Sequence, residues 1–381
     1  MSTDDETMEG LEASCVDLTP YRTDSTSFVS STIQERAVVQ DKLWRQLEST
    51  GFCLVRGTGV DGTLCHEALR CCHAFLQETP ESVRRSTLTK DRARRGYSPV
   101  NTENFASLLG EQRPNDLVRK FRIGNGDGQS ALLQPNVWPD TDLWPESTVF
   151  QTTIQRYYDA LVEASFLVLE ALCDAVEQHR PNSAASNSLN VLKKDGKGCT
   201  VNGTDSTDTV TTKDSTTTSI LTLLGYRKGA RHQQKKDTAE LVAAHTDVGV
   251  VTILLFDQGD CAVLQRHDRV SDTYIDVRVP PIQETTTDKE GTPLNDPVFV
   301  VNIGDCTEAL SGLPSTKHRV VPRPGKTPRN CLALFVGLDP NVRLELPLDS
   351  DGTQTETMTY EGWRRRRIAK AQSVLRGNHG P

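Results

Sequence analysis

The apolar positions in the first half of the chain follow a helical period. In the first predicted helix they recur at spacings of three, four and seven: Ile33, Ala37, Trp44 and Leu47. This is the pattern of one buried helix face. Gly51 ends that helix, and residues 52–55 (FCLV) predict a short strand. Further helices are predicted at 64–75, from Glu81 onward and at 150–179. We therefore expect a mostly helical amino-terminal region.

Beyond residue 218 the pattern changes to short apolar runs separated by Gly, Pro, Asp or Asn. Eight strands are predicted: 219–226, 240–244, 249–256, 261–265, 273–279, 298–303, 318–321 and 331–336. Short strands without intervening helices favour a double-sheet jelly roll or barrel over a parallel α/β sheet. Tyr360–Leu375 predicts a carboxy-terminal helix, and we interpret its run Arg364–Arg367 as a solvated face.

Residues 181–218 differ from both halves. Of these 38 residues, 14 are Ser or Thr, and we find no apolar period among them. Such a segment buries too little surface to offset the entropy of ordering it, so we predict a disordered insertion. The expected organisation has five parts: a disordered amino terminus (1–13), a helical region (14–180), the insertion (181–218), the β domain (219–345) and a helix with a tail (346–381).

Composition limits the class of protein. The chain has 381 residues, 36% hydrophobic, and a formal charge of −8, which argues against a protein built mainly to bind nucleic acid. Its most apolar stretch, 160–176, contains three acidic residues and predicts no membrane span. The acidic opening MSTDDETMEG does not resemble a secretory or mitochondrial signal. We expect a cytoplasmic monomer that acts without nucleic acid or membrane.

The candidate chemistry lies in the predicted β domain. His245 and Asp247 are two residues apart, so on a strand they would address the same face. His318 lies in another predicted strand and supplies a third ligand. Two histidines and a carboxylate form the facial triad of non-haem Fe(II) oxygenases, although these ligand types also suit zinc or manganese. Arg329, eleven residues further on, could bind a carboxylate in a bidentate manner.

The chain resembles the iron- and 2-oxoglutarate-dependent dioxygenases of the isopenicillin N synthase-like branch. The matching stretches in the second half are AHTDVGVVTILLFDQ (244–258), FVVNIGDCTEALSG (299–312), STKHRVV (315–321) and TYEGWRRRR (359–367). Those in the first half include VDLTP (16–20), ESTGFCLVRGTGV (48–60), RGYSPVNTEN (95–104) and NDLVRKFRIG (115–124). The resemblance implies an α+β fold: a double-stranded β-helix (jelly roll) core with a mostly helical amino-terminal region and a carboxy-terminal helix.

The resemblance also implies the roles of the site residues. His245, Asp247 and His318 become the iron ligands, with no catalytic residue expected beyond them. Arg329 becomes the partner of the distal carboxylate of 2-oxoglutarate, and Tyr226 lies where the family often has a tyrosine that hydrogen-bonds the same molecule. The family usually has serine two residues after the arginine, whereas this chain has Cys331, and a thiol is a weaker donor than a hydroxyl.

The implied activity is that of an oxidoreductase. It couples oxidative decarboxylation of 2-oxoglutarate to hydroxylation, desaturation or ring closure of a small organic substrate, using Fe(II), O₂ and ascorbate as a reductant. Two alternatives stay open from the sequence. One is an oxidase of the same fold that does not use 2-oxoglutarate, and the other is a catalytically silent module that binds a metal or ligand.

Overall fold

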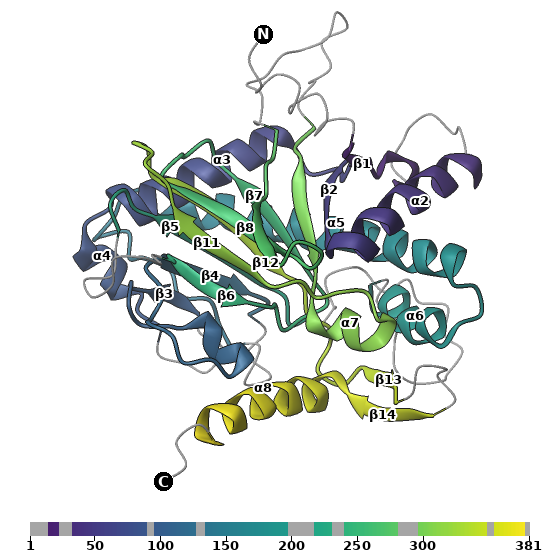
Figure 1. Ribbon diagram of the computed structural model, residues 1–381. Helices are drawn as coiled ribbons and strands as arrows, with labels where there is room; N and C mark the ends of the chain where they lie inside the picture. Colours follow the sequence, from purple (N-terminus) through teal and green to yellow (C-terminus); the bar gives the residue numbers. More distant parts are fainter. Residues whose placement is uncertain are drawn as a thin grey trace, which may run out of the picture.

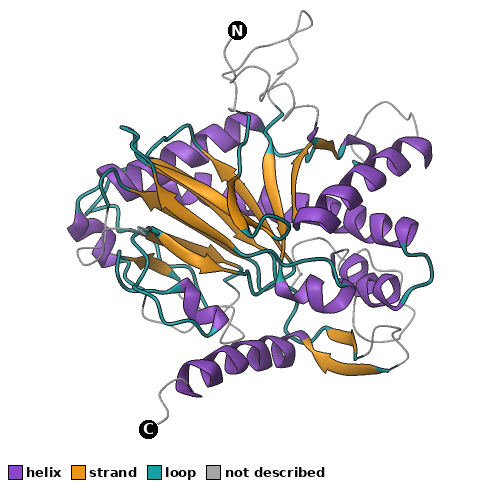
Figure 2. Ribbon diagram, in the orientation of Figure 1, coloured by secondary structure: helices purple, strands orange, loops and turns teal. Residues whose placement is uncertain are grey.

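The computed structural model describes residues 14–22, 33–89, 95–126, 134–196, 217–230, 240–280, 296–348 and 354–377. Two β-sheets face each other at its centre, and long helices pack on the outer face of the larger sheet (Figure 1). Figure 2 shows the sheets as a central block of strands with the helices around it. This is the α+β jelly-roll architecture that was expected.

The larger sheet contains eight strands among the described residues, in the order β1-β2-β10-β7-β12-β5-β4-β3. Neighbouring strands within this sheet are antiparallel, except for the parallel pair β1 and β2. The strands are β1 (Val16–Asp17), β2 (Phe52–Arg56), β3 (Gly96–Ser98), β4 (Arg119–Gly124), β5 (Ile220–Tyr226), β7 (Val251–Phe256), β10 (Phe299–Ile303) and β12 (Arg329–Phe335).

The smaller sheet has the order β6-β11-β8-β9. Its strands are β6 (Val242–His245), β11 (His318–Pro322), β8 (Ala262–Asp268) and β9 (Thr273–Asp276). Alternate side chains of both sheets point into the space between them, as the two-residue period of a strand requires. One buried apolar cluster fills that space and includes Leu224, Leu254, Phe256, Leu264 and Val320.

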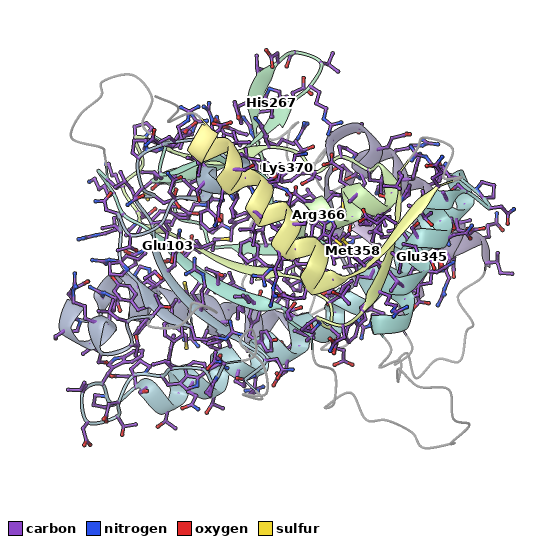
Figure 3. The ribbon with its side chains drawn as sticks, turned by 90° about the horizontal axis from the view of Figure 1, so that it is seen from below. Glu103, His267, Glu345, Met358, Arg366 and Lys370 are labelled. Atoms are coloured by element: carbon purple, nitrogen blue, oxygen red, sulfur yellow. The ribbon has the colours of Figure 1, made fainter. Side chains whose placement is uncertain are left out.

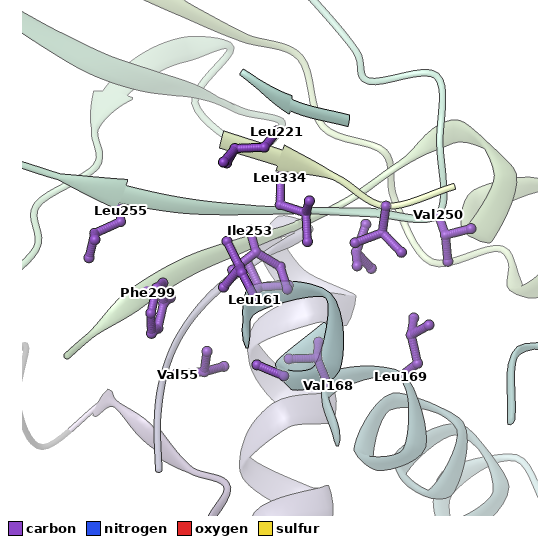
Figure 4. Close-up of a cluster of buried hydrophobic side chains, with 14 of the residues drawn as sticks. Val55, Leu161, Val168, Leu169, Leu221, Val250, Ile253, Leu255, Phe299 and Leu334 are labelled. Carbon is purple, nitrogen blue, oxygen red and sulfur yellow. The ribbon is translucent and has the colours of Figure 1, made fainter. Parts of the chain in front are cut away.

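Helices cover the opposite face of the larger sheet. Those in contact with the sheet are α2 (Ile33–Thr50), α3 (Gly62–His73) and α5 (Ser147–His179). The other helices of this part of the structure are α4 (Glu81–Ser86), α6 (Ala184–Gly196) and α7 (Asp305–Ser311), with shorter turns η1 (Thr19–Tyr21), η2 (Ala74–Glu78) and η3 (Phe105–Leu109). Figure 4 shows Leu161 of α5 beside Ile253 of the sheet, with Val168 further along the helix in the same buried cluster. Burial of each such side chain contributes about 1.5–3 kcal/mol.

All eight strands predicted after residue 218 are confirmed, with ends within three residues of the prediction. The helices α2 and α5 and the carboxy-terminal helix α8 (Tyr360–Gly377) are confirmed as well. The patterns did not predict β3, β4, α7 or the hairpin of β13 (Arg343–Pro347) and β14 (Thr355–Thr359). The amino-terminal region therefore contributes strands to the same sheet as the predicted β domain. None of the described helices is long and apolar enough to cross a membrane.

The predicted disordered insertion 181–218 is wrong over its first third. Residues 184–196 form α6, which packs on α5 and α7. Leu189 and Leu192 lie three residues apart on one helix face and are fully buried. Two leucines were too few to give a visible period within a polar segment. Residues 197–216 of the predicted insertion lie outside the described residues, whereas 217 and 218 are described.

Substituting Leu192 by alanine tests the packing of α6. Removing a fully buried leucine side chain leaves a cavity, so the free energy of unfolding should fall by about 2–5 kcal/mol. Asn190→Ala, on the exposed face of the same helix, is the matched control and should change stability little. Urea denaturation of both variants measures the difference. Equal stability of the two variants would mean that α6 does not pack against the core.

Candidate metal centre

The two histidines of the predicted triad face each other across a pair of strands. His245 is the last residue of β6 and His318 the first of β11, and the antiparallel register places them directly opposite. Their ring centroids are 4.4 Å apart. Cross-strand neighbours of this kind have side chains on the same face of the sheet, so both imidazoles enter one space.

Asp247 completes the group from outside the strand. β6 ends at His245, so the expectation that Asp247 lies on the same strand is wrong; it lies in the connection to β7. Its two carboxylate oxygens are 3.6 Å from His245 Nε2 and 3.7 Å from His318 Nε2. All three side chains are buried, and their ligand atoms lie within 4.8 Å of one another. Among the described residues this is the one cluster of histidine, cysteine and acidic side chains with such spacing.

Backbone carbonyls fix the orientation of both imidazoles. Nδ1 of His245 is 2.9 Å from the carbonyl oxygen of Ala243, and Nδ1 of His318 is 3.1 Å from that of Thr316. A carbonyl oxygen only accepts, so each Nδ1 carries the hydrogen and each Nε2 keeps a free lone pair. A histidine that binds a metal through one ring nitrogen is usually supported by such a hydrogen bond from the other ring nitrogen.

The carboxylate of Asp247 is held by two neighbouring strands. Its Oδ2 accepts hydrogen bonds from Thr252 Oγ1 at 2.6 Å and from Asn302 Nδ2 at 2.9 Å. Thr252 and Asn302 are partners in the register of β7 and β10, so the two donors stand side by side. Sequence reasoning missed both residues. The signal that could have found Asn302 is an amide within the apolar run FVVNI (299–303).

Burial and nearby charges keep His245 and Asp247 in the protonation states that bind a cation. Burial, together with the nearby His318, lowers the pKa of His245 well below its usual value, so the imidazole stays neutral. Burial alone would raise the pKa of Asp247, but the two histidines and the hydrogen bonds from Thr252 and Asn302 hold it below its ordinary value. The site therefore offers a neutral His245 imidazole and an ionised Asp247 carboxylate.

A second group of predicted residues lies on the larger sheet. Arg329, the first residue of β12, is directly opposite Tyr226 on β5, and Cys331 is two residues further along the same strand. All three side chains are buried, and those of Tyr226 and Cys331 belong to the apolar cluster between the sheets. Burial raises the pKa of Cys331 to about 12 and also raises the pKa of Tyr226. Both therefore remain neutral hydrogen-bond donors.

Arg329 has few partners for a buried guanidinium. Its NH1 donates to the carbonyl oxygen of Ala262 at 3.4 Å, and its Cζ lies 4.2 Å from the centroid of the Phe256 ring. No carboxylate of the described residues forms an ion pair with it. A guanidinium has five N–H donors, and a buried charge is costly unless it is paired. The arrangement suits an anionic ligand.

Four charged residues whose side chains are at most 9% exposed form a cluster next to Phe105, the ring that stacks on His245, and sequence reasoning missed them. On β4, Phe121 and Ile123 face the helices, whereas Lys120 and Arg122 face the interior. The partners of these two cations are Glu103 and Asp116: Lys120 Nζ lies 3.1 Å from Glu103 and 3.0 Å from Asp116, and Arg122 NH2 lies 2.6 Å from Glu103.

This charged group supports the chain around the first histidine. Asp116 accepts from the backbone N–H of Ala243 at 3.4 Å and of Phe105 at 3.2 Å. The Phe105 ring stacks on the His245 ring with centroids 4.8 Å apart. Lys120 Nζ lies 3.9 Å from the centroid of the same Phe105 ring. Burial would raise the pKa of Glu103, but Arg122 and Lys120 hold it below its ordinary value.

Comparison with known proteins gives consistent matches. Residues 15–141 match the family described as non-haem dioxygenase in morphine synthesis N-terminal, and residues 224–338 match the 2OG-Fe(II) oxygenase superfamily. The chain is 25% identical over 365 residues to the 2-oxoglutarate-dependent dioxygenase citB of Monascus ruber, which covers 91% of each chain. It is 26% identical over 340 residues to the 2-oxoglutarate-dependent dioxygenase traH of Penicillium crustosum, with 85% of each chain covered.

A solved structure shows the same fold. The crystal structure of full-length Neurospora crassa T7H in complex with alpha-KG and thymine superposes with a TM-score of 0.64 at 17% identity. The superposition covers 93% of this chain and 96% of that one. The arrangement of the two facing sheets and their helices is therefore shared with that protein.

Breaking the buried charged group should destabilise the fold. In Lys120→Met, Asp116 loses its cation while it stays buried, and the free energy of unfolding should fall by about 3–5 kcal/mol. In the double variant Lys120→Met/Asp116→Asn both charges are gone, so the loss should be smaller. Chemical denaturation of both variants measures the effect. The control is Lys317→Met, which removes a lysine that pairs with Glu111 at the surface. Additive losses in the double variant would contradict the coupling.

Proposed function

Because the chain belongs to the Fe(II)- and 2-oxoglutarate-dependent oxygenase superfamily, we propose that His245, Asp247 and His318 are the protein ligands of its iron ion. The protein is a 2-oxoglutarate-dependent dioxygenase, with Fe(II) as its cofactor and 2-oxoglutarate as its cosubstrate. The observation that carries the ligand assignment is that the Nε2 atoms of both histidines lie within 3.7 Å of the buried Asp247 carboxylate, while each Nδ1 is held by a backbone carbonyl.

The donor set fits this metal. Two imidazoles and one carboxylate leave open positions on an Fe(II) ion, as in other non-haem oxygenases. When bound, iron with 2-oxoglutarate and O₂ supplies the oxidising chemistry that yields succinate, CO₂ and an oxidised organic substrate. The chain itself orients its three ligands through Ala243, Thr316 and the donors to Asp247. The apolar walls between the sheets limit the access of water to the site.

We further propose that Arg329 binds the distal carboxylate of 2-oxoglutarate. Its buried guanidinium has no carboxylate partner among the described residues, and it lies beside two neutral donors, Tyr226 and Cys331. Charge-assisted hydrogen bonds from a planar guanidinium would fix the orientation of the keto acid. The hydroxyl of Tyr226 and the thiol of Cys331 would donate to the same carboxylate. This supports use of 2-oxoglutarate over the alternative of an oxidase without it.

The organic substrate is proposed to be a small molecule that undergoes hydroxylation, desaturation or ring closure. Similarity to curated 2-oxoglutarate-dependent dioxygenases over most of the chain supports this reaction class. The formal charge of −8 supports a partner other than nucleic acid. That the enzyme works as a cytoplasmic monomer stays a prediction from the sequence, as does a role for ascorbate as reductant.

Replacing His318 by alanine tests the iron site. We expect the variant to keep its fold and to lose most of its metal binding and turnover, because one of three ligands is gone. Anaerobic titration with Fe(II) or Co(II), together with circular dichroism, measures both properties. His267→Ala is the matched control, since that histidine lies on the adjacent strand and pairs with Asp272 outside the triad. Wild-type metal content in His318→Ala would overturn the assignment.

Arg329→Ala tests the cosubstrate site. Loss of charge-assisted hydrogen bonds worth roughly 1.5–3 kcal/mol should weaken 2-oxoglutarate binding about 10- to 100-fold. Isothermal titration of the Mn(II)-loaded protein with 2-oxoglutarate measures the affinity without a known substrate. The control is Arg323→Ala, in which a partly exposed arginine that pairs with Asp276 is lost. Unchanged affinity in Arg329→Ala would show that the keto acid binds elsewhere or not at all.

Cys331→Ser should act in the opposite direction. It replaces a weak S–H donor by a stronger O–H donor, so 2-oxoglutarate should bind a few-fold more tightly, a gain of about 1 kcal/mol or less. The same titration measures this gain, and Cys261→Ser provides a control at a nearby buried thiol. An unchanged or weaker affinity would mean that residue 331 does not contact the carboxylate. O₂ consumption with and without 2-oxoglutarate separates the dioxygenase from the oxidase alternative.

A further inference from the structure

The four consecutive arginines of α8 do not form the uniformly solvated face that their sequence suggests. Arg365 and Arg366 follow that expectation: their side chains are 78% and 50% exposed, and they pair with Glu361 and Glu356 at the surface. The side chain of Arg367 is only 21% exposed. Figure 3 shows α8 lying across the underside of the molecule, with Arg366 and Lys370 labelled along it. Arg367 therefore corrects the interpretation of this run.

The guanidinium of Arg367 binds three separate segments. Its Nε and NH2 each lie 2.8 Å from Asp305 Oδ2, at the start of α7. Its NH1 donates to the carbonyl oxygen of Leu108 in η3 at 2.7 Å. Its NH2 also lies 3.5 Å from Thr246 Oγ1. A planar fork with five donors can serve three acceptors at once, which a lysine ammonium on a flexible stem does far less well.

Each of these segments contacts the proposed iron site. Thr246 lies between His245 and Asp247 in the chain. The backbone N–H of Asp305 donates to the carbonyl oxygen of Asp247 at 2.8 Å. η3, which contains Leu108, begins at Phe105, and the Phe105 ring covers the His245 imidazole.

Asp305 extends the same connection toward the third proposed ligand. Its Oδ1 accepts a hydrogen bond from Ser315 Oγ at 2.7 Å. The next residue, Thr316, supplies the carbonyl oxygen that orients His318. Gly110 closes η3 against α8, because a Cβ at this position would lie 2.8 Å from the carbonyl oxygen of Ala371. One guanidinium thus connects the backbone around all three proposed ligands with the segment that covers them.

We infer that Arg367 is a positioning residue that sets the geometry of the metal-binding face from outside the site. The inference rests on the proposed function, because it takes His245, Asp247 and His318 as the iron ligands. Arg367 contacts none of these three side chains. It acts through Asp305, Thr246 and η3, whose positions determine where the imidazole of His245 and the carboxylate of Asp247 lie.

The test compares Arg367→Ala and Arg367→Lys with Arg366→Ala, the exposed neighbour on the same helix. Anaerobic titration with Co(II) measures metal affinity, and the visible ligand-field spectrum of the Co(II) protein reports the geometry of its ligands. We expect Arg367→Ala to bind Co(II) about 10-fold more weakly, a loss typical of removing a residue that supports metal ligands. We also expect its spectrum to be altered. Arg366→Ala should match wild type in both measurements.

Arg367→Lys keeps the charge and most of the stem, so it carries the test if the alanine variant does not fold. It should show the same altered spectrum, because one ammonium cannot replace the fork. Wild-type affinity and spectrum in both Arg367 variants, with only a lower melting temperature, would reduce Arg367 to a structural tether and overturn the inference. Failure of the proposed function is distinguished by His318→Ala: if that variant binds Co(II) like wild type, the ligand assignment itself is wrong and the inference falls with it.

Discussion

The pairing of β6 with β11 is the constraint on which the candidate site depends. It places His245 opposite His318 on one face of the smaller sheet. A shift of one residue in this register would turn one imidazole to the other face and separate the two ligands. The apolar side chains Val242 and Val320 pack between the sheets and are paired with each other, and a shift in the register beyond this pair brings His245 opposite His318. The strand pairing that packs the core therefore also sets the positions of the two histidines.

The charges inside the jelly roll fall into two kinds. Lys120 and Arg122 are matched by Glu103 and Asp116, so this group is satisfied internally and serves to hold the chain around His245. Arg329 is buried in the same interior but has no such partner among the described residues. Since a buried charge is stable only when it is compensated, the contrast supports the proposal that Arg329 binds an anionic ligand.

The candidate site also draws on parts of the chain that are far apart in sequence. η3 covers the imidazole of His245, α7 binds the backbone of Asp247, and α8 holds both through Arg367. Each of these contacts is a hydrogen bond or ring contact, and those to Thr246 and Asp247 are made just after β6 has ended. Such supports are needed because the proposed ligand Asp247 lies beyond the end of β6.

The sequence by itself determined the strands after residue 218, the long helices and the three candidate ligands, because apolar periodicity and the spacing of His245, Asp247 and His318 are local properties. It could not show that the interior-facing residues of the polar strand Arg119–Gly124 are buried, since burial on both faces depends on what packs there. The predictions of disorder at 184–196 and of a solvated Arg367 were also wrong. Two leucines and one arginine carry no signal of their own, and only the tertiary structure decided that each meets a partner distant in the chain and is thereby removed from water.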